Sequence, residues 1–139
     1  MSIALIGATG NAGSRILDKL VRRNHAVIAI VRDISKVPAL TGVTAKAGNV
    51  NDADGLAALI AGHNAVISSV HFSASDPEKL IAAVRKAKVP RYLVVGGAGS
   101  LEVAPGTRLI DTPGFPDAYR KEAGGGAAFL DRLRETHDT

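Results

Sequence analysis

Three glycines near the N-terminus constrain the fold of this chain more than any other feature. They stand in a GxxGxxG spacing, in the segment Gly7-Ala8-Thr9-Gly10-Asn11-Ala12-Gly13. An apolar stretch, Ser2 to Ile6, precedes this segment, and a helical pattern follows it from Ala12. In such loops the first glycine permits a tight turn, the second lets the backbone approach a pyrophosphate, and the third lets the helix pack closely on the strand. The segment therefore predicts a strand–loop–helix unit that binds a dinucleotide.

Short apolar strands and amphipathic helices alternate along the rest of the chain, a pattern typical of a parallel α/β sheet. The expected strands are residues 2–6, 26–31, 43–47, 65–70 and 92–95. The expected helices are residues 12–23 and 52–61, a third from Asp76 until Pro90 ends it, and a last one through Leu133. Because crossovers between parallel strands are right-handed, we expect a doubly wound sheet of about five strands, ordered 3-2-1-4-5, with helices on both faces.

The last helical segment contains an unusual glycine triplet, Gly124-Gly125-Gly126, after a long loop that begins at Gly96. Each glycine costs a helix on the order of 1 kcal/mol relative to alanine. We therefore expect the last helix to begin after the triplet or to be frayed there.

Composition limits the classes of protein to which the chain can belong. Its 139 residues suffice for one domain, residues 1–139, and 46% hydrophobic with 22% charged residues is ordinary globular composition. Cysteine is absent, which excludes disulfide scaffolds, thiolate zinc sites and cysteine nucleophiles, and we predict no metal site. Aromatic residues make up 4%, too few for a base-stacking surface. The net charge of +4 then indicates a solvated basic surface and no nucleic-acid partner.

The N-terminal residues resemble neither a signal peptide nor a membrane anchor. No basic side chain precedes Gly7, and no stretch approaches the roughly 18 apolar residues of a membrane span. We expect a soluble, cytoplasmic protein without a membrane partner.

The residue that ends the second expected strand selects between the two nicotinamide dinucleotides. An acid there binds the ribose 2′-hydroxyl of NAD, whereas an arginine accommodates the 2′-phosphate of NADP. Here Arg32 follows Val31 directly, and Lys36 adds positive charge nearby. Asp33 is the competing signal for NAD, although its alternative role is to cap the short helix after it. We expect NADPH as the preferred cofactor and NAD as the alternative.

Further cofactor contacts are expected at the carboxyl ends of the strands, where open parallel sheets bind their ligands. After the third strand, Asn49 could hydrogen-bond adenine and Val50 could pack on it. Ser68 and Ser69 end the fourth strand beside the expected nicotinamide ribose, with hydrogen bonding within the strand end as the alternative. The predicted cofactor-binding residues are Gly7, Thr9, Gly10, Asn11, Ala12, Gly13, Arg32, Asn49, Val50, Ser68, Ser69 and Gly96.

Two residues after the last strands are candidates for contacts with a substrate. His71 follows the fourth strand and Ser100 follows the fifth. We predict that they are the catalytic residues, acting as hydrogen-bonding groups to a hydride acceptor. The alternative for His71 is an exposed loop residue, and His25, His63 and His137 are expected at the surface.

Four segments together resemble a known family: GATGNAGS, VRD, GNV and VVGGAGSLEVAPGTRLIDTPGFPDAYRKEA. They are similar to atypical short-chain dehydrogenases/reductases, and within these to the NADH-flavin reductase group, which is related to biliverdin-IXβ reductase and to NmrA-like proteins. The resemblance covers residues 1 to about 123, and VVGGAGSLEVAPG is specific to this subgroup. It implies a Rossmann fold, NADPH at the glycine loop and Arg32, and hydride transfer to a flavin or similar acceptor.

The chain departs from that family at several positions. Asn49 stands where family members usually have aspartate. The Tyr-x-x-x-Lys pair of the wider superfamily is absent, because Tyr119 is followed four residues later by Ala123. No serine stands at the usual catalytic position after the fifth strand, and Ser100 lies just beyond it. Similar proteins also continue into a further strand and a substrate lobe, so we expect that lobe to be missing or reduced here.

Two functions from different classes follow. The first is an oxidoreductase that transfers hydride from NADPH to a flavin, a quinone or a similar conjugated acceptor. Such acceptors delocalise the incoming charge, so the chemistry depends mainly on positioning and fits the missing Tyr/Lys pair. The second is a non-catalytic NAD(P)-sensing or partner-binding regulator of the NmrA-like type. A sugar-nucleotide epimerase is disfavoured because that chemistry needs the Tyr and Lys. A homodimer is expected as a means of covering an exposed sheet edge.

Overall fold

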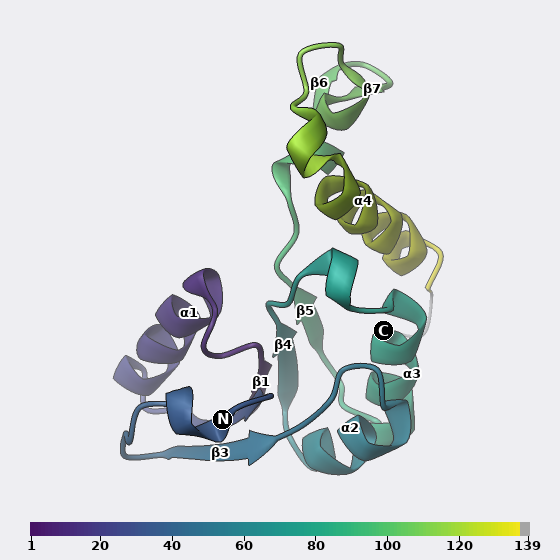
Figure 1. Cartoon of the computed structure of the whole chain (residues 1–139). Helices are drawn as coiled ribbons and strands as arrows, with labels where there is room; N and C mark the ends of the chain where they lie inside the picture. The colour runs from purple at the N-terminus through teal and green to yellow at the C-terminus, as the bar shows by residue number, and fades with distance from the viewer. Residues whose placement is uncertain (137–139) are drawn as a thin grey trace. The chain divides into compact units, whose positions relative to one another are not determined.

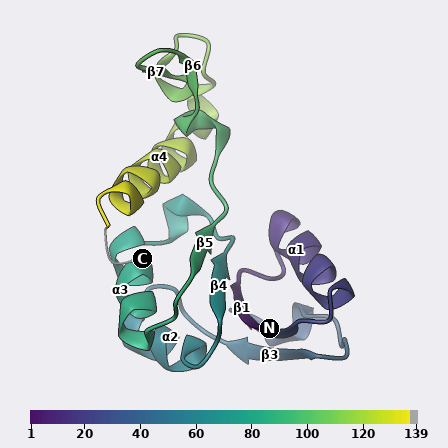
Figure 2. The same ribbon diagram turned by 180° about the vertical axis from the view of Figure 1, so that it is seen from behind.

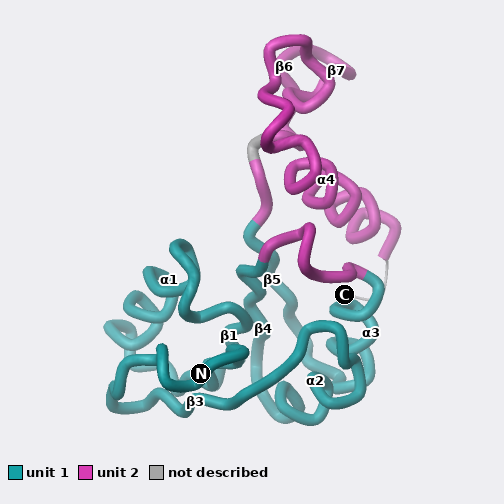
Figure 3. The backbone as a smooth tube through the Cα atoms, viewed as in Figure 1, with its two compact units in different colours: residues 1–70, 78–95 teal, residues 71–77, 96–139 magenta. Residues whose placement is uncertain are grey.

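The computed structural model describes residues 1–136, apart from the side chain of residue 98. These residues form two compact units, which Figure 3 colours separately. Unit 1 consists of Met1–Val70 and Glu78–Val95, and the described part of unit 2 consists of His71–Pro77 and residues 96–136. The expectation of one domain with a reduced C-terminal lobe stays a prediction.

The sheet of unit 1 has five parallel strands in the order β3-β2-β1-β4-β5 (Figure 1). The strands are β1 (Ser2–Ile6), β2 (Ala26–Val31), β3 (Val43–Ala47), β4 (Ala65–Ser68) and β5 (Tyr92–Val94). The predicted doubly wound parallel sheet and its strand order are confirmed. The fourth strand ends at Ser68 rather than at the expected residue 70, since the chain turns there into the next loop.

Helices cover both faces of this sheet, as the sequence predicts. They are α1 (Asn11–Arg22), α2 (Ala53–Ile60) and α3 (Pro77–Ala87). Figures 1 and 2 show α1 against one face and α2 and α3 against the other. Asp52 caps α2, because its carboxylate accepts the Gly55 N–H at 3.1 Å. A short 3₁₀ turn, η1 (Ile34–Lys36), lies between β2 and β3.

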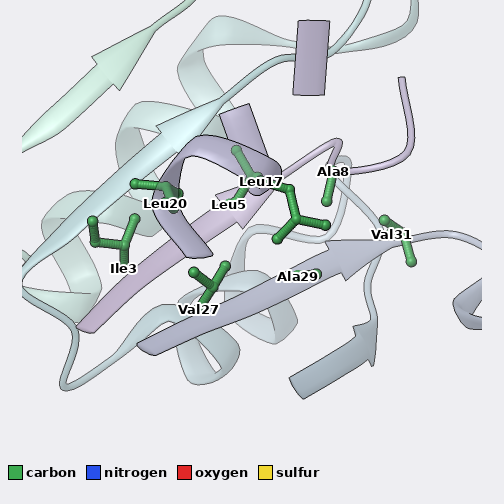
Figure 4. Packing of buried hydrophobic residues seen from close by; sticks show 8 residues of the cluster. All are labelled: Ile3, Leu5, Ala8, Leu17, Leu20, Val27, Ala29 and Val31. Atoms are coloured by element: carbon green, nitrogen blue, oxygen red, sulfur yellow. The ribbon is translucent and has the colours of Figure 1, made fainter. Parts of the chain in front are cut away.

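The α1 face holds a continuous hydrophobic core (Figure 4). Leu17 and Leu20 of α1 pack on alternate residues of β1 and β2, because successive side chains of a strand point to opposite faces of the sheet. The buried cluster consists of Ile3, Leu5, Ala8, Leu17, Leu20, Val27, Ala29 and Val31. Each fully buried leucine or isoleucine stabilises the fold by about 1.5–3 kcal/mol. Ala8 of the glycine loop belongs to the same cluster, so this core also anchors the loop at the end of β1.

Two histidines at the amino ends of the strands are less exposed than the sequence suggests. His63 is partly buried, with its Nδ1 2.6 Å from Ser2 Oγ, and burial lowers the pKa of His63. His25 is also partly buried, and its Nδ1 has no hydrogen-bond partner among residues 1–136. Both residues keep part of their surface exposed, so the expectation that they lie at the surface holds in part. His137, the third of these residues, lies outside the described residues.

Unit 2 is built on one long helix, α4 (Arg120–Arg134). The expected loop after Gly96 instead contains an antiparallel hairpin, β6 (Glu102–Ala104) and β7 (Thr107–Arg108), that turns at Gly106 with φ +78°. Short 3₁₀ turns make up much of the rest: η2 (Phe72–Ala74), η3 (Ala98–Ser100), η4 (Leu109–Asp111) and η5 (Asp117–Tyr119).

The glycine triplet lies inside α4, so the expectation that the helix begins after it is wrong. Phe72 explains the difference. A Cβ added at Gly125 would lie 2.8 Å from Phe72 Cβ, and one added at Gly126 would lie 2.8 Å from the Phe72 ring. The Phe72 ring also meets Phe129 edge-on, with 6.0 Å between ring centroids. Aromatic packing against the bare helix backbone therefore offsets the low helix propensity of these glycines.

Two arginines tie the loop after β5 to α4. Arg120 donates to Asp117 at 2.9 Å and to the Ile110 carbonyl at 2.8 Å, and its guanidinium lies 5.6 Å from the centre of the Phe115 ring. Arg108 forms a two-pronged pair with Asp131, at 3.1 and 2.6 Å. Such two-pronged pairs restrict geometry more than single contacts do, so the loop has a defined place on α4.

No helix within residues 1–136 combines the length and the apolar character that crossing a membrane requires.

Candidate functional site

The turn after β1 can be made only by glycine. Gly7 has φ +84°, in the left-handed region that L side chains rarely adopt. A Cβ at this position would also overlap the Ser69 carbonyl oxygen and lie 3.0 Å from Val70 Cγ1. The first glycine of the motif is therefore required twice, by its backbone conformation and by the chain that follows β4.

The third glycine brings α1 against this turn. A Cβ at Gly13 would overlap the Gly7 carbonyl oxygen, so no side chain fits between the helix and the turn. The second glycine differs from both. A Cβ at Gly10 would meet only the Gly7 carbonyl oxygen, at 3.6 Å, which is ordinary contact. Gly10 is exposed, so its missing side chain leaves open surface above the loop.

The N-terminus of α1 beside Gly10 is ready to bind an anion. Gly10 is the N-cap residue, and no side chain among residues 1–136 caps the helix. The Ser14 N–H donates to the Gly10 carbonyl oxygen at 2.9 Å. The N–H groups of Asn11 and Ala12, by contrast, have no acceptor in the described part of the chain. The first turn contains no acidic residue. Free N–H groups and the positive end of the helix dipole therefore face solvent beside exposed Thr9, as phosphate binding requires.

Strand pairing brings the other predicted residues of unit 1 to the same edge of the sheet. Ile6 at the end of β1 pairs with Ile30 and Ser68, and Val31 pairs with Ala47. The residues that follow these strands therefore leave the sheet together at its carboxyl edge, where open sheets bind ligands. They are Gly7, Arg32, Asn49 and Ser69.

Arg32 and Asp33 differ in whether their side chains are already engaged. The Asp33 carboxylate caps η1, accepting the Ser35 N–H at 3.0 Å and the Ser35 hydroxyl at 2.6 Å. These hydrogen bonds lower the pKa of Asp33. Arg32 is exposed and forms neither a hydrogen bond nor an ion pair with residues 1–136. The alternative role considered for Asp33, a helix cap, is the one this geometry shows.

Asn49 keeps part of its side chain available. Its Oδ1 accepts the Asn51 N–H at 2.9 Å, while its amide nitrogen has no partner within residues 1–136. This hydrogen bond fixes the side chain at the end of β3 and leaves the donor group exposed. Val50 beside it is partly exposed. Gly48 is a residue that the sequence analysis missed: a Cβ there would lie 2.6 Å from Ile30 Cγ2, so this turn also needs glycine.

Ser68 is engaged within the sheet. It is 1% exposed, and its Oγ lies 2.8 Å from the Tyr92 hydroxyl on β5. Burial raises the pKa of Tyr92 to about 12, although the Ser68 hydrogen bond acts in the opposite direction. This matches the alternative considered for Ser68, hydrogen bonding at the strand end. Ser69 is partly exposed, and its N–H donates to the Ile6 carbonyl at 2.9 Å.

His71, Ser100 and Gly96 all belong to unit 2. His71 is exposed, with its Nδ1 3.5 Å from a Glu122 carboxylate oxygen. Ser100 donates its hydroxyl proton to the Gly97 carbonyl oxygen at 3.0 Å, so this proton is already engaged. Gly96 is exposed, and a Cβ there would meet no described atom within 4 Å.

Glu122 is the main residue of unit 2 that sequence reasoning missed. Its carboxylate accepts the Phe72 N–H at 2.6 Å and the Ser73 N–H at 2.8 Å. Partial burial acts to raise the pKa of Glu122, but these hydrogen bonds and the nearby His71 outweigh it and lower the pKa. No local signal could have revealed this contact, since 50 residues separate Glu122 from Phe72.

Comparison with known proteins identifies the family. A family model described as NAD(P)H-binding matches residues 7–131, which include the glycine loop and most of α4. The chain belongs to this NAD(P)H-binding family. The matched residues include the glycine loop of unit 1. No group of three or more histidine or acidic side chains within residues 1–136 is placed to hold a metal ion.

Relatives of this NAD(P)H-binding protein support an oxidoreductase-like family. The uncharacterised protein YwnB of Bacillus subtilis is 38% identical over 142 residues, which cover 98% of the chain and 67% of YwnB. A solved structure from Streptococcus pneumoniae, provisionally assigned as an NADH-flavin reductase, is 33% identical with a TM-score of 0.78, covering 99% of the chain and 68% of that protein.

Two further solved structures carry other provisional assignments. An exported protein of Burkholderia pseudomallei is 40% identical with a TM-score of 0.86, covering 99% of the chain and 68% of that protein. An epimerase of Bacteroides thetaiotaomicron is 33% identical with a TM-score of 0.91, and the chain covers 66% of it. The NAD(P)H-binding chain thus spans about two thirds of the length of its relatives.

Proposed function

We propose that this protein is an NADPH-dependent reductase of a flavin or a similar conjugated acceptor. The observation that carries the proposal is the glycine loop. Gly7 and Gly13 leave no room for side chains below it, whereas Gly10 and the free N–H groups of Asn11 and Ala12 leave an open, positively polarised surface above it. These residues fit the pyrophosphate of a dinucleotide.

The side chains after β2 favour NADPH over NADH. Arg32 is exposed and has no partner within residues 1–136, and Lys36 is exposed nearby. Asp33, which would bind the ribose of NAD, already accepts two hydrogen bonds from Ser35. A 2′-phosphate would supply the anion that Arg32 lacks, since arginine pairs strongly with phosphate oxygens.

The protein groups proposed at the site bind and orient rather than transfer protons. When bound, reduced nicotinamide supplies a hydride, which an acceptor takes up together with a proton from solvent. Asn49 has a free amide nitrogen that suits adenine, with Val50 packing beside it. His71 and Ser100 stay proposals as hydrogen-bonding groups to the acceptor. Ser100 would have to give up its bond to the Gly97 carbonyl in order to donate.

Calorimetry with NADPH and with NADH tests the cofactor. The same protein is then given flavin mononucleotide, and oxidation of NADPH is followed by the absorbance of the reduced nicotinamide. We expect tighter binding of NADPH than of NADH, and oxidation that depends on both protein and flavin. Failure to bind either dinucleotide would overturn the proposal.

A non-catalytic NAD(P)-sensing protein is the second candidate. Two observations favour it: Tyr119 is not followed by the lysine that completes the superfamily pair, and the Ser100 hydroxyl is engaged. The missing lysine also weighs against epimerase chemistry, which needs that pair. Tight NADPH binding without oxidation by flavins or quinones would favour the sensing role.

The cytoplasmic location and the homodimer are also proposals. Leu93 on β5, a strand that is paired only with β4 within the described residues, is 46% exposed, and pairing of two copies would cover such an edge. Cell fractionation and light scattering test the two proposals separately.

A further inference from the structure

The turn after His71 is held by a side chain from α4. Phe72 and Ser73 begin η2, and the first N–H groups of a helical turn have no partner within the turn itself. His71, the N-cap residue, supplies no side-chain bond to them. Glu122 accepts both N–H groups instead, at 2.6 and 2.8 Å. One carboxylate therefore satisfies both groups.

The same face of α4 packs against η2 and η3. Gly125 and Gly126 contact Phe72, the residue next to His71. Ala123 precedes Gly125 by two residues on α4. A Cβ at Gly99 of η3 would lie 2.9 Å from Ala123 Cβ, so α4 also contacts the residue next to Ser100. The residues next to His71 and Ser100 thus pack on neighbouring positions of α4.

Of the two, only His71 has a side chain near a carboxylate of α4 within the described residues. Its Nδ1 lies 3.5 Å from Glu122 Oε1, and its side chain is 84% exposed. An exposed imidazole on a short turn would otherwise sample several positions. The bonds to the next two N–H groups restrict the backbone on which the imidazole is carried, and the carboxylate gives the ring a partner.

We propose that Glu122 is a positioning residue that holds the 71–73 backbone and so places the His71 imidazole for the acceptor. This inference rests on the proposed reductase function, in which His71 binds the acceptor. Glu122 itself touches neither cofactor nor acceptor in this assignment. Its effect is expected on acceptor binding rather than on NADPH binding.

The first test measures the backbone without reference to activity. Amide exchange of Phe72 and Ser73, followed by NMR, should accelerate on the order of tenfold in Glu122→Ala, because a hydrogen bond to a carboxylate is lost at each amide. Glu122→Gln retains a carbonyl acceptor and should give an intermediate rate. Glu135→Gln, an exposed position at the end of the same helix, is the matched control and should match wild type. Unchanged exchange in Glu122→Ala would overturn the inference.

The second test asks whether Glu122 acts through His71. In flavin-dependent NADPH oxidation, Glu122→Ala and His71→Ala should each raise the KM for flavin severalfold while the Kd for NADPH stays at the wild-type value. The double variant should be no worse than His71→Ala alone, since coupled residues are not additive. Fully additive effects, or a loss of NADPH affinity, would show that Glu122 only maintains the fold and would overturn the inference.

The two proposals can fail separately. If wild-type protein oxidises no NADPH with any flavin or quinone, the proposed reductase function falls, and with it the role of His71 towards an acceptor. The exchange experiment still decides whether Glu122 holds the 71–73 backbone. If the wild-type enzyme is active and exchange in Glu122→Ala is unchanged, the positioning role alone falls.

Discussion

Gly13 lies so close to Gly7 that a Cβ added to Gly13 would overlap the Gly7 carbonyl oxygen. This contact joins the first turn of α1 to the end of β1 and fixes where the free N–H groups of the helix point. Gly10, between the two, has no such constraint. The three glycines of one motif therefore serve two separable purposes, close packing at Gly7 and Gly13 and an open surface at Gly10.

Gly13→Ala and Gly10→Ala should separate these purposes. The alanine methyl at position 13 meets backbone that cannot move aside, so we expect a loss of about 1–3 kcal/mol in the free energy of unfolding, together with lost NADPH binding. At position 10 the methyl fits, so stability should stay near wild type while NADPH affinity falls on the order of tenfold or more, because the backbone can no longer approach the pyrophosphate. Urea unfolding and calorimetry measure the two effects. Wild-type NADPH affinity in Gly10→Ala would contradict the assignment of the phosphate loop.

Arg32→Ala should weaken the binding of NADPH far more than the binding of NADH. A charge-assisted hydrogen bond to phosphate contributes about 1.5–3 kcal/mol, so the Kd for NADPH should rise on the order of tenfold to a hundredfold. The Kd for NADH should change little, because NADH has no 2′-phosphate. Arg23→Ala, at an exposed position that ends α1, is the control for loss of one positive charge. Equal losses for both dinucleotides would show that Arg32 does not read the 2′-phosphate.

Tyr92→Phe should destabilise unit 1 by leaving the Ser68 hydroxyl buried without its partner. An unsatisfied buried hydroxyl costs about 1–3 kcal/mol. Ser68→Ala removes the other partner and should cost a similar amount. The double variant should cost less than the sum of the two, because neither polar group is then left alone. Thermal unfolding by circular dichroism measures all three variants, and strictly additive losses would contradict the pairing.

The raised pKa of Tyr92 also predicts that the protein loses stability at alkaline pH. Burial raises its pKa from 10.0 to about 12, so above pH 10 the unfolded chain loses a phenol proton that the folded chain keeps. The unfolded state then binds fewer protons, and the free energy of unfolding should fall by about 1.4 kcal/mol per pH unit until the pH approaches 12. Tyr92→Phe should lack this part of the slope. Tyr119→Phe, at a position 65% exposed, should keep the wild-type slope.

The three glycines of α4 should respond differently to alanine. A Cβ at Gly124 would meet only Ile110 Cδ1, at 3.8 Å, so Gly124→Ala should stabilise by about 0.5–1 kcal/mol through helix propensity. Gly125→Ala and Gly126→Ala should destabilise instead, because their methyl groups would lie 2.8 Å from Phe72. Chemical unfolding of the three variants in parallel provides the comparison. Stabilisation by all three would show that Phe72 does not pack on the helix backbone.

The sheet and the tight glycine turn after β1 could be predicted from the sequence because local patterns determine them. Alternation of apolar strands with amphipathic helices indicates a parallel sheet, and right-handed crossovers restrict its strand order. The spacing of Gly7, Gly10 and Gly13 indicates the loop, because the residues that shape this turn lie only a few positions apart in the chain. Asp52 as the cap of α2 is predictable for the same reason.

Contacts between distant segments were decided only by the tertiary structure. The glycine triplet argues against a helix when propensity alone is considered, and only Phe72, some 50 residues earlier in the chain, explains why α4 passes through it. Likewise, Ser68 resembles a ligand contact until Tyr92 is seen beside it, and Glu122 resembles an ordinary surface acid until its two N–H partners are known. Periodicity in a sequence shows which side of an element is buried, but the partner that buries it depends on packing between segments far apart in the chain.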